Sequence, residues 1–254
     1  MEHLVQRAVA VIRERFAEPL SLEDLAQSAM VSKYYFLRVF TRVTGVTPGR
    51  FLSAVRLQEA KRLLLSTSLN VSDVATRVGY SSAGSFTRRF TESVGLSPTQ
   101  YRKLSLGSGC EPLEPALCEV VPASSVLLPQ ARSTGSVTGV LRTSGVRLST
   151  VYVGAFDGVI LQGVPASWSN ASASGRFTLA RVPTGTWYIH AVALGRPPGS
   201  TADEDPTLLM ATVGPVPVAG DTGKSLDITL SPMDWTRPPI LSALTGIAPQ
   251  AIAA

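Results

Sequence analysis

The stretch that decides the fold is residues 79–102, GYSSAGSFTRRFTESVGLSPTQYR, together with residues 32–51, SKYYFLRVFTRVTGVTPGRF. The two stretches align at an offset of 50 residues, and residues 22–26 align with residues 71–75 at an offset of 49. The matched positions are Phe36, Arg38, Phe40, Gly45, Pro48 and Phe51, with Phe86, Arg88, Phe90, Gly95, Pro98 and Tyr101. This agreement predicts two copies of one helical unit.

Each copy carries the signals of two short helices joined by a tight turn. Ser21 and Asn70 are typical N-cap residues, and each has an acid three positions later. Gly79 suits a left-handed position after the first helix of the second copy. In both copies a hydroxyl residue followed by proline then opens a further helix, at Thr47 and at Ser97. Two short helices around a tight turn form the helix-turn-helix pattern, whose second helix fits the major groove of DNA.

The second helix of each copy, about 32–44 and about 82–94, has a polar face opposite its two phenylalanines. We expect that face to contact DNA through Ser32, Lys33, Tyr34, Leu37, Arg38, Arg42, Ser82, Ala83, Ser85, Thr87, Arg88 and Arg89. Arg38 and Arg88 suit guanine O6 and N7, and Tyr34 and Ala83 suit the thymine methyl group. Arginine at the same position in both copies favours this role over a merely solvated helix face.

The motifs in residues 22–51 and 79–102 resemble those of the AraC/XylS family of transcription regulators. The resemblance covers about residues 1–104 and implies seven helices, with a long helix joining the two units. It implies that both recognition helices enter successive major grooves of one duplex, and that RNA polymerase is a further partner. The segment Ala83-Gly84-Ser85 is smaller than in many members, which favours backbone over base contacts in the second unit.

Charge and composition separate the chain into two parts. Residues 1–104 contain 15 basic and 8 acidic side chains, whereas residues 105–254 contain 8 and 10, so the first part carries the positive excess. Such a surface attracts polyanions. No membrane-spanning run, signal peptide or disulfide framework is evident, so we expect a reduced, cytoplasmic protein that does not bind membranes.

The second part shows apolar residues at every second position, which is typical of strands. Examples are Val151, Val153 and Ala155, and Leu226, Ile228 and Leu230. About seven such runs, separated by glycine and proline, predict an antiparallel Greek-key β-sandwich. Residues 175–189, GRFTLARVPTGTWYI, are similar to carboxypeptidase regulatory-like, prealbumin-type domains, which implies an accessory domain without catalysis.

The expected organisation is therefore helical first and β second. It comprises a double helix-turn-helix domain (1–104), a linker rich in glycine and proline (105–134), a β-sandwich (135–231) and an irregular tail (232–254). The sequence indicates no enzyme, no cofactor and no metal site, because His3 and His190 are its only histidines and its two cysteines, Cys110 and Cys118, lie in the linker.

Three functions remain open from the sequence. The first is a sequence-specific transcription regulator whose β-domain senses a small-molecule effector, forms a homodimer or contacts a partner. The second is a DNA-repair methyltransferase, which the absence of a cysteine flanked by proline and histidine disfavours. The third is a non-specific, architectural DNA-binding module whose sandwich docks other proteins.

Overall fold

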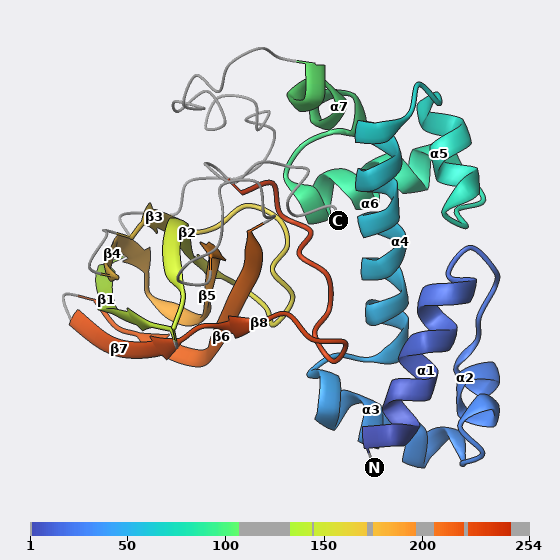
Figure 1. The fold of residues 1–254 in the computed structure, drawn as a ribbon, viewed down its shortest axis with the longest axis horizontal. Coiled ribbons are helices and arrows are strands. Elements are labelled where there is room, and N and C mark those ends of the chain that lie inside the picture. The colour runs from blue at the N-terminus through green and yellow to red at the C-terminus, as the bar shows by residue number, and fades with distance from the viewer. Residues whose placement is uncertain are drawn as a thin grey trace.

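The computed structural model describes residues 2–106, 133–143, 145–171, 175–196, 206–220 and 223–244, which form a helical part and a β part lying side by side (Figure 1). The helices are α1 (Glu2–Arg15), α2 (Leu22–Ser28), α3 (Lys33–Thr44), α4 (Pro48–Ser66), α5 (Val71–Arg77), α6 (Ala83–Val94) and α7 (Pro98–Leu106). The strands are β1 (Thr134–Arg142), β2 (Arg147–Phe156), β3 (Ser167–Asn170), β4 (Arg176–Pro183), β5 (Gly185–Arg196), β6 (Thr207–Val218), β7 (Gly223–Thr229) and β8 (Ser231–Pro232).

The predicted order of helices and then strands is confirmed. Of the predicted linker, residues 107–132 lie outside the described residues, and so do residues 245–254 of the predicted tail.

The internal repeat is visible in the helical core as two equivalent aromatic clusters. In the first, Phe40 packs against Phe36 and Phe51 with ring centroids 5.5 and 5.6 Å apart. In the second, Phe90 packs in the same way against Phe86 and Tyr101, at 5.5 and 5.7 Å. Every one of these rings is buried, and each buried phenylalanine stabilises the fold by roughly 1.5–3 kcal/mol. The repeat thus gives each unit its own aromatic cluster within one helical core, with α4 between the two units (Figure 1).

The β part consists of two sheets with a shared apolar core. Their strand orders are β4-β1-β7 and β3-β2-β5-β6-β8. Side chains from both sheets, such as Val137 and Leu179 facing Val153 and Ile189, belong to one buried cluster. The pairing differs from the antiparallel prediction in one place, because β1 and β7 run parallel. The reason is that β7 follows β6 of the other sheet, so no hairpin fixes its direction.

The larger sheet also buries much of its second face, which the alternating pattern did not predict. On β5 every residue from 189 to 193 is buried. Tyr152, Val192 and Met210 pack on this outer face against Leu161, from the loop between β2 and β3, and against Ile240 in the segment after β8. The sheet therefore lies between the sandwich core and a second layer that reaches the helices.

His190 ties this second layer to the sheet. Its side chain is fully buried, and Nε2 lies 2.9 Å from the carbonyl oxygen of Gly158 while Nδ1 lies 3.0 Å from the Thr212 hydroxyl. Because a carbonyl only accepts, the ring donates from Nε2 and accepts the hydroxyl proton at Nδ1. The structure therefore makes His190 a packing residue.

We expect His190 to make stability pH-dependent. Burial lowers the pKa of its imidazole from 6.5 to about 4. As the pH falls, His190 is protonated in the unfolded chain before it is protonated in the folded chain. The free energy of unfolding therefore decreases between pH 6.5 and pH 4. The loss amounts to about 3 kcal/mol. Urea unfolding at several pH values should give a shallower pH slope between 6.5 and 4 for His190→Gln than for the wild type. Equal slopes would contradict the buried neutral ring.

Two segments join the β part to the helices. In the loop between β2 and β3, the Gly163 amide donates to the Ser93 carbonyl of α6 (2.6 Å), and Ile160 enters the helical core. In the segment after β8, Leu241 enters the same core, and the Ala243 amide donates to the Val94 carbonyl (3.0 Å). Buried apolar residues of both segments therefore belong to the helical core.

Lys61, in the middle of α4, anchors the segment after β8. Its ammonium group is buried and donates to the carbonyl oxygen of Ile240 at 2.8 Å. It also lies 5.7 Å from the centroid of the Tyr101 ring. Burial lowers the pKa of Lys61 from 10.5 to about 7. A lysine on the joining helix, which the sequence analysis left unassigned, thus belongs to the contact between the two parts.

Candidate nucleic-acid interface

Cap residues fix both ends of α3 and the start of α2. Ser21 and Asp24 form a reciprocal capping box at the start of α2. The Ser32 hydroxyl accepts from the Tyr35 amide at the start of α3, and Gly45 ends α3 with a left-handed φ of 77°. The tight turn between α2 and α3 therefore follows directly from the cap residues that the sequence displays.

The helices of the second unit are capped in the same way. Asn70 caps α5 by accepting from the Asp73 amide at 2.8 Å, and Ser82 caps α6 by accepting from the Ser85 amide. Gly95 ends α6 with a left-handed φ of 86°. The Ser85 hydroxyl also contacts the Ser82 hydroxyl at 2.8 Å, so part of its hydrogen-bonding capacity is used within the cap.

The residues expected to contact DNA lie on the open faces of α3 and α6. Tyr34 is 79% exposed, the largest exposed fraction among the large apolar side chains in the described residues. The exposed members of the set are Ser32, Lys33, Tyr34, Arg38, Arg42, Ser82, Ser85, Arg88 and Arg89. Leu37, Ala83 and Thr87 are partly buried. The phenylalanines between them point inward, so each helix presents one polar face.

Neighbouring side chains hold the basic groups of α3. The Arg38 guanidinium lies 5.5 Å from the centroid of the Tyr35 ring. Lys33 lies over the Tyr34 ring at 5.6 Å and forms an exposed ion pair with Glu23 at 3.5 Å. Tyr35 was not among the predicted contact residues. Its position three residues before Arg38 could have revealed it, because such residues are neighbours on a helix.

Helices α3 and α6 lie at opposite ends of α4 (Figure 1). With 19 residues, α4 is about 28 Å long at 1.5 Å per residue. That length is close to one turn of a DNA duplex, about 34 Å. The spacing of the two units is therefore commensurate with two successive major grooves on one face of DNA.

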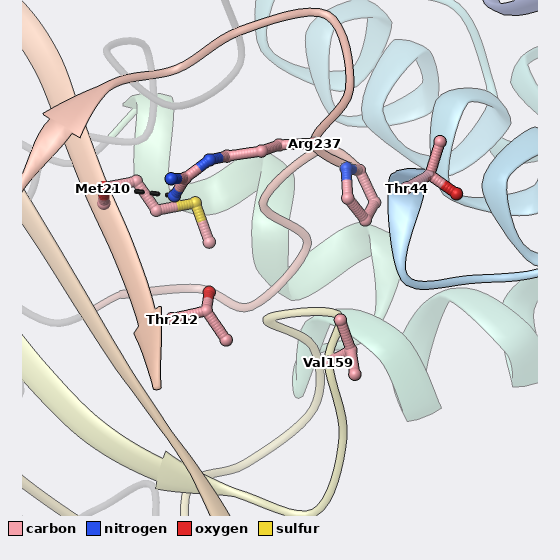
Figure 2. A pocket seen from close by; sticks show the side chains of 6 residues that line it. Thr44, Val159, Met210, Thr212 and Arg237 are labelled. Carbon is pink, nitrogen blue, oxygen red and sulfur yellow. Dashed lines mark hydrogen bonds between the residues drawn. The ribbon is translucent and has the colours of Figure 1, made fainter. Parts of the chain in front are cut away.

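The β part contacts the C-terminal ends of α3 and α6. A Cβ atom on Gly45 would lie 3.1 Å from Val159, and one on Gly95 would lie 3.3 Å from Val164. Thr44, at the end of α3, lines a pocket together with Val159 and Arg237 (Figure 2). The volume of this pocket is about 130 Å³. Tyr34, at the start of α3, stays exposed. One loop thus touches the ends of both helices and leaves Tyr34 open.

Among the described residues, no three histidine, cysteine or acidic side chains gather in a way that could hold a metal ion. Within the same part of the chain, no helix is long and apolar enough to cross a membrane. The chemistry that the exposed faces of α3 and α6 offer is hydrogen bonding, positive charge and aromatic contact. Together with the double helix-turn-helix geometry, these faces define a DNA-binding protein.

Comparison with known proteins gives the family. Residues 25–104 match the model of a helix-turn-helix domain. The transcriptional activator AarP of Providencia stuartii is 32% identical over 104 residues, which are 41% of this chain and 77% of AarP. The chain belongs to the AraC family of helix-turn-helix transcription regulators.

Other similar proteins share a smaller part of their length with this chain. An uncharacterised transcriptional regulator of Haemophilus influenzae is 44% identical over 82 residues, 32% of this chain and 28% of that protein. The melibiose operon regulatory protein of Escherichia coli is 32% identical over 101 residues, 40% of this chain and 33% of its own length. The chain thus covers about a third or less of these two relatives.

Proposed function

We propose that the protein is a sequence-specific regulator that places α3 and α6 in successive major grooves of one duplex. The single observation that carries the proposal is the pair of matched arginines, Arg38 and Arg88, exposed on equivalent faces of two capped helices at opposite ends of α4. Arginine is the side chain that most often binds guanine specifically, through O6 and N7. RNA polymerase is the partner on which such a regulator would act.

The two units contribute unequally in this proposal. On α3, Tyr34, Leu37, Arg38 and Arg42 offer long side chains, and the start of the helix, at Ser32 and Lys33, binds phosphate. On α6, Ala83 and Gly84 are small, and the Ser85 hydroxyl is engaged in its own cap. Arg88 and Thr87 would read bases there, while Ser82 and Arg89 contact the backbone. The first unit therefore supplies most of the sequence preference.

We infer that the β-domain holds the two helix-turn-helix units in a fixed relative position. The observation that supports it is the set of contacts from one loop to the ends of both recognition helices, together with the hydrogen bond from Lys61 to Ile240. The outer face of the larger sheet is covered by the protein's own segment after β8. Dimerisation through that face is disfavoured for the same reason, since a second copy would have to displace this segment.

Selection from a randomised duplex library, with the full chain at one fixed salt concentration, tests the DNA-reading role. We expect one asymmetric motif about two duplex turns long, because two different helices of a single chain read it. Binding in low salt without any enriched motif would replace this proposal with the architectural alternative, since phosphate contacts alone carry no sequence information. Enrichment of a symmetric pair of half-sites would contradict the monomeric reading.

A further inference from the structure

A hollow of about 350 Å³ lies where the two helix-turn-helix units meet the β-domain. Its volume is within the range of sites for small molecules, about 300–1,000 Å³. Helices α4 and α6 and two segments of the β part contribute to its wall. The wall includes Arg50 and Ser53 of α4, Arg89 and Ser93 of α6, Gln162 of the loop between β2 and β3, and Leu241 of the segment after β8. The hollow therefore borders the proposed DNA-contacting face of α6 at Arg89, whereas its other wall residues lie outside the expected DNA contacts.

The polar groups around the hollow have unused hydrogen-bonding capacity. Ser93 is only 5% exposed, and its hydroxyl bonds to no other described residue. Within the described chain the same holds for the Ser53 hydroxyl, the Gln162 amide and the Arg50 guanidinium. Ser93 is buried, Ser53 and Gln162 are partly buried, and Arg50 is exposed, so this set is accessible to a ligand that carries oxygen atoms.

The charge of the hollow is positive. Arg50 and Arg89 come from different helix-turn-helix units, and none of the described residues in the wall is acidic. Arg89 forms an exposed ion pair with Glu92 on the same helix at 3.9 Å, beyond hydrogen-bonding distance. Two guanidinium groups on one cavity repel each other unless an anion lies between them. The planar guanidinium group can donate two parallel hydrogen bonds to the oxygens of a carboxylate or a phosphate.

We propose that this hollow binds a small organic oxyanion, either a phosphate ester or a polycarboxylate with a hydroxyl group, as an effector. The oxyanion contacts Arg50 and Arg89, and the hydroxyl groups contact Ser93 and Gln162. Because the ligand touches both units and the β-domain, its binding favours one spacing of the recognition helices. The effector role rests on the proposed function, since DNA affinity is its readout.

Calorimetric titration of the full chain without DNA tests the site itself. The probes are glycerol phosphate and citrate, with glycerol as the neutral control. We expect at least one anion to bind and glycerol not to bind. Arg50→Gln and Gln162→Leu should each weaken binding by about tenfold or more, which is the effect of about 1.4 kcal/mol. Arg62→Gln, an exposed arginine of the same helix paired with Glu59, should leave binding unchanged.

Three outcomes overturn the proposal. In the first, neither anion binds. In the second, Arg62→Gln loses as much anion affinity as Arg50→Gln. In the third, any duplex displaces the anion, whatever its sequence. The last result would make the hollow a contact for DNA phosphates.

DNA affinity in the presence of saturating anion tests the effector role. We expect the dissociation constant for the selected duplex to change by about threefold or more in the wild type and to stay constant in Gln162→Leu. An unchanged constant in the wild type would remove the effector role. If the library selection yields no motif while the anion still binds at Arg50, the proposed DNA-reading function has failed and the anion site remains.

Discussion

The double variant Arg38→Ala, Arg88→Ala should lose about 2–6 kcal/mol of binding free energy for the selected duplex, because each bidentate contact to guanine discriminates by about 1–3 kcal/mol. Each single variant should lose half of that range and should relax the preference at one base pair. Fluorescence anisotropy with the selected duplex, and with single-base changes in it, measures both quantities at one salt concentration.

The reason for a large effect is that both guanidinium groups are exposed on the faces opposite the phenylalanine clusters, and Arg38 is held over Tyr35 at 5.5 Å. A matched control is Arg62→Ala, which removes an exposed arginine of α4 outside the predicted interface. If the double variant lost the same factor for the selected and for a scrambled duplex, both arginines would contact phosphates only. The base-reading role would then be wrong.

Gly139→Val should unfold the β-domain, at a cost of about 4 kcal/mol or more. Gly139 lies on β1, the middle strand of the smaller sheet, between Phe177 of β4 and Leu226 of β7. A Cβ atom at this position would lie 2.0 Å from the Leu226 carbonyl oxygen and 2.8 Å from the Phe177 ring. Because the nearer atom belongs to the backbone, no change of rotamer relieves the clash, and β1 must separate from β7.

Thermal and urea unfolding, followed by tryptophan fluorescence and circular dichroism, measure the effect. Thr138→Val on the same strand is the matched control, since it keeps a β-branched side chain of similar size at the neighbouring position. An unfolding free energy within about 1 kcal/mol of the wild type would contradict the close approach of β1 and β7. If the β-domain braces the two units, Gly139→Val should also weaken binding to the selected duplex, although no DNA-facing residue is changed.

Local signals were enough to predict the helical part. Cap residues such as Ser21 and Ser32, and the left-handed positions at Gly45 and Gly95, fix where each short helix begins and ends. The aromatic pattern of Phe36, repeated fifty residues later at Phe86, fixes which face of each recognition helix is buried. Helix periodicity and capping depend on residues within a few positions of one another, so a single sequence contains them.

Pairing between distant segments could not be predicted in the same way. His190 of β5 is fully buried because a loop and the segment after β8 cover the second face of the sheet, which the alternating pattern of the strands did not predict. The parallel pairing of β1 with β7 has no local signal, since the strands are far apart in the chain. Strand direction and the covering of a second sheet face depend on contacts between residues that are not neighbours in sequence.

The sequence by itself therefore determined the two capped helix-turn-helix units, their arginine-bearing faces and the change from helices to strands. Only the tertiary structure decided that the β part contacts the ends of α3 and α6, that Lys61 binds Ile240, and that Arg50 and Arg89 share one hollow. The physical reason is the range of the interactions. Capping and amphipathic periodicity act within one or two helical turns, whereas packing of the two parts joins residues up to 179 positions apart.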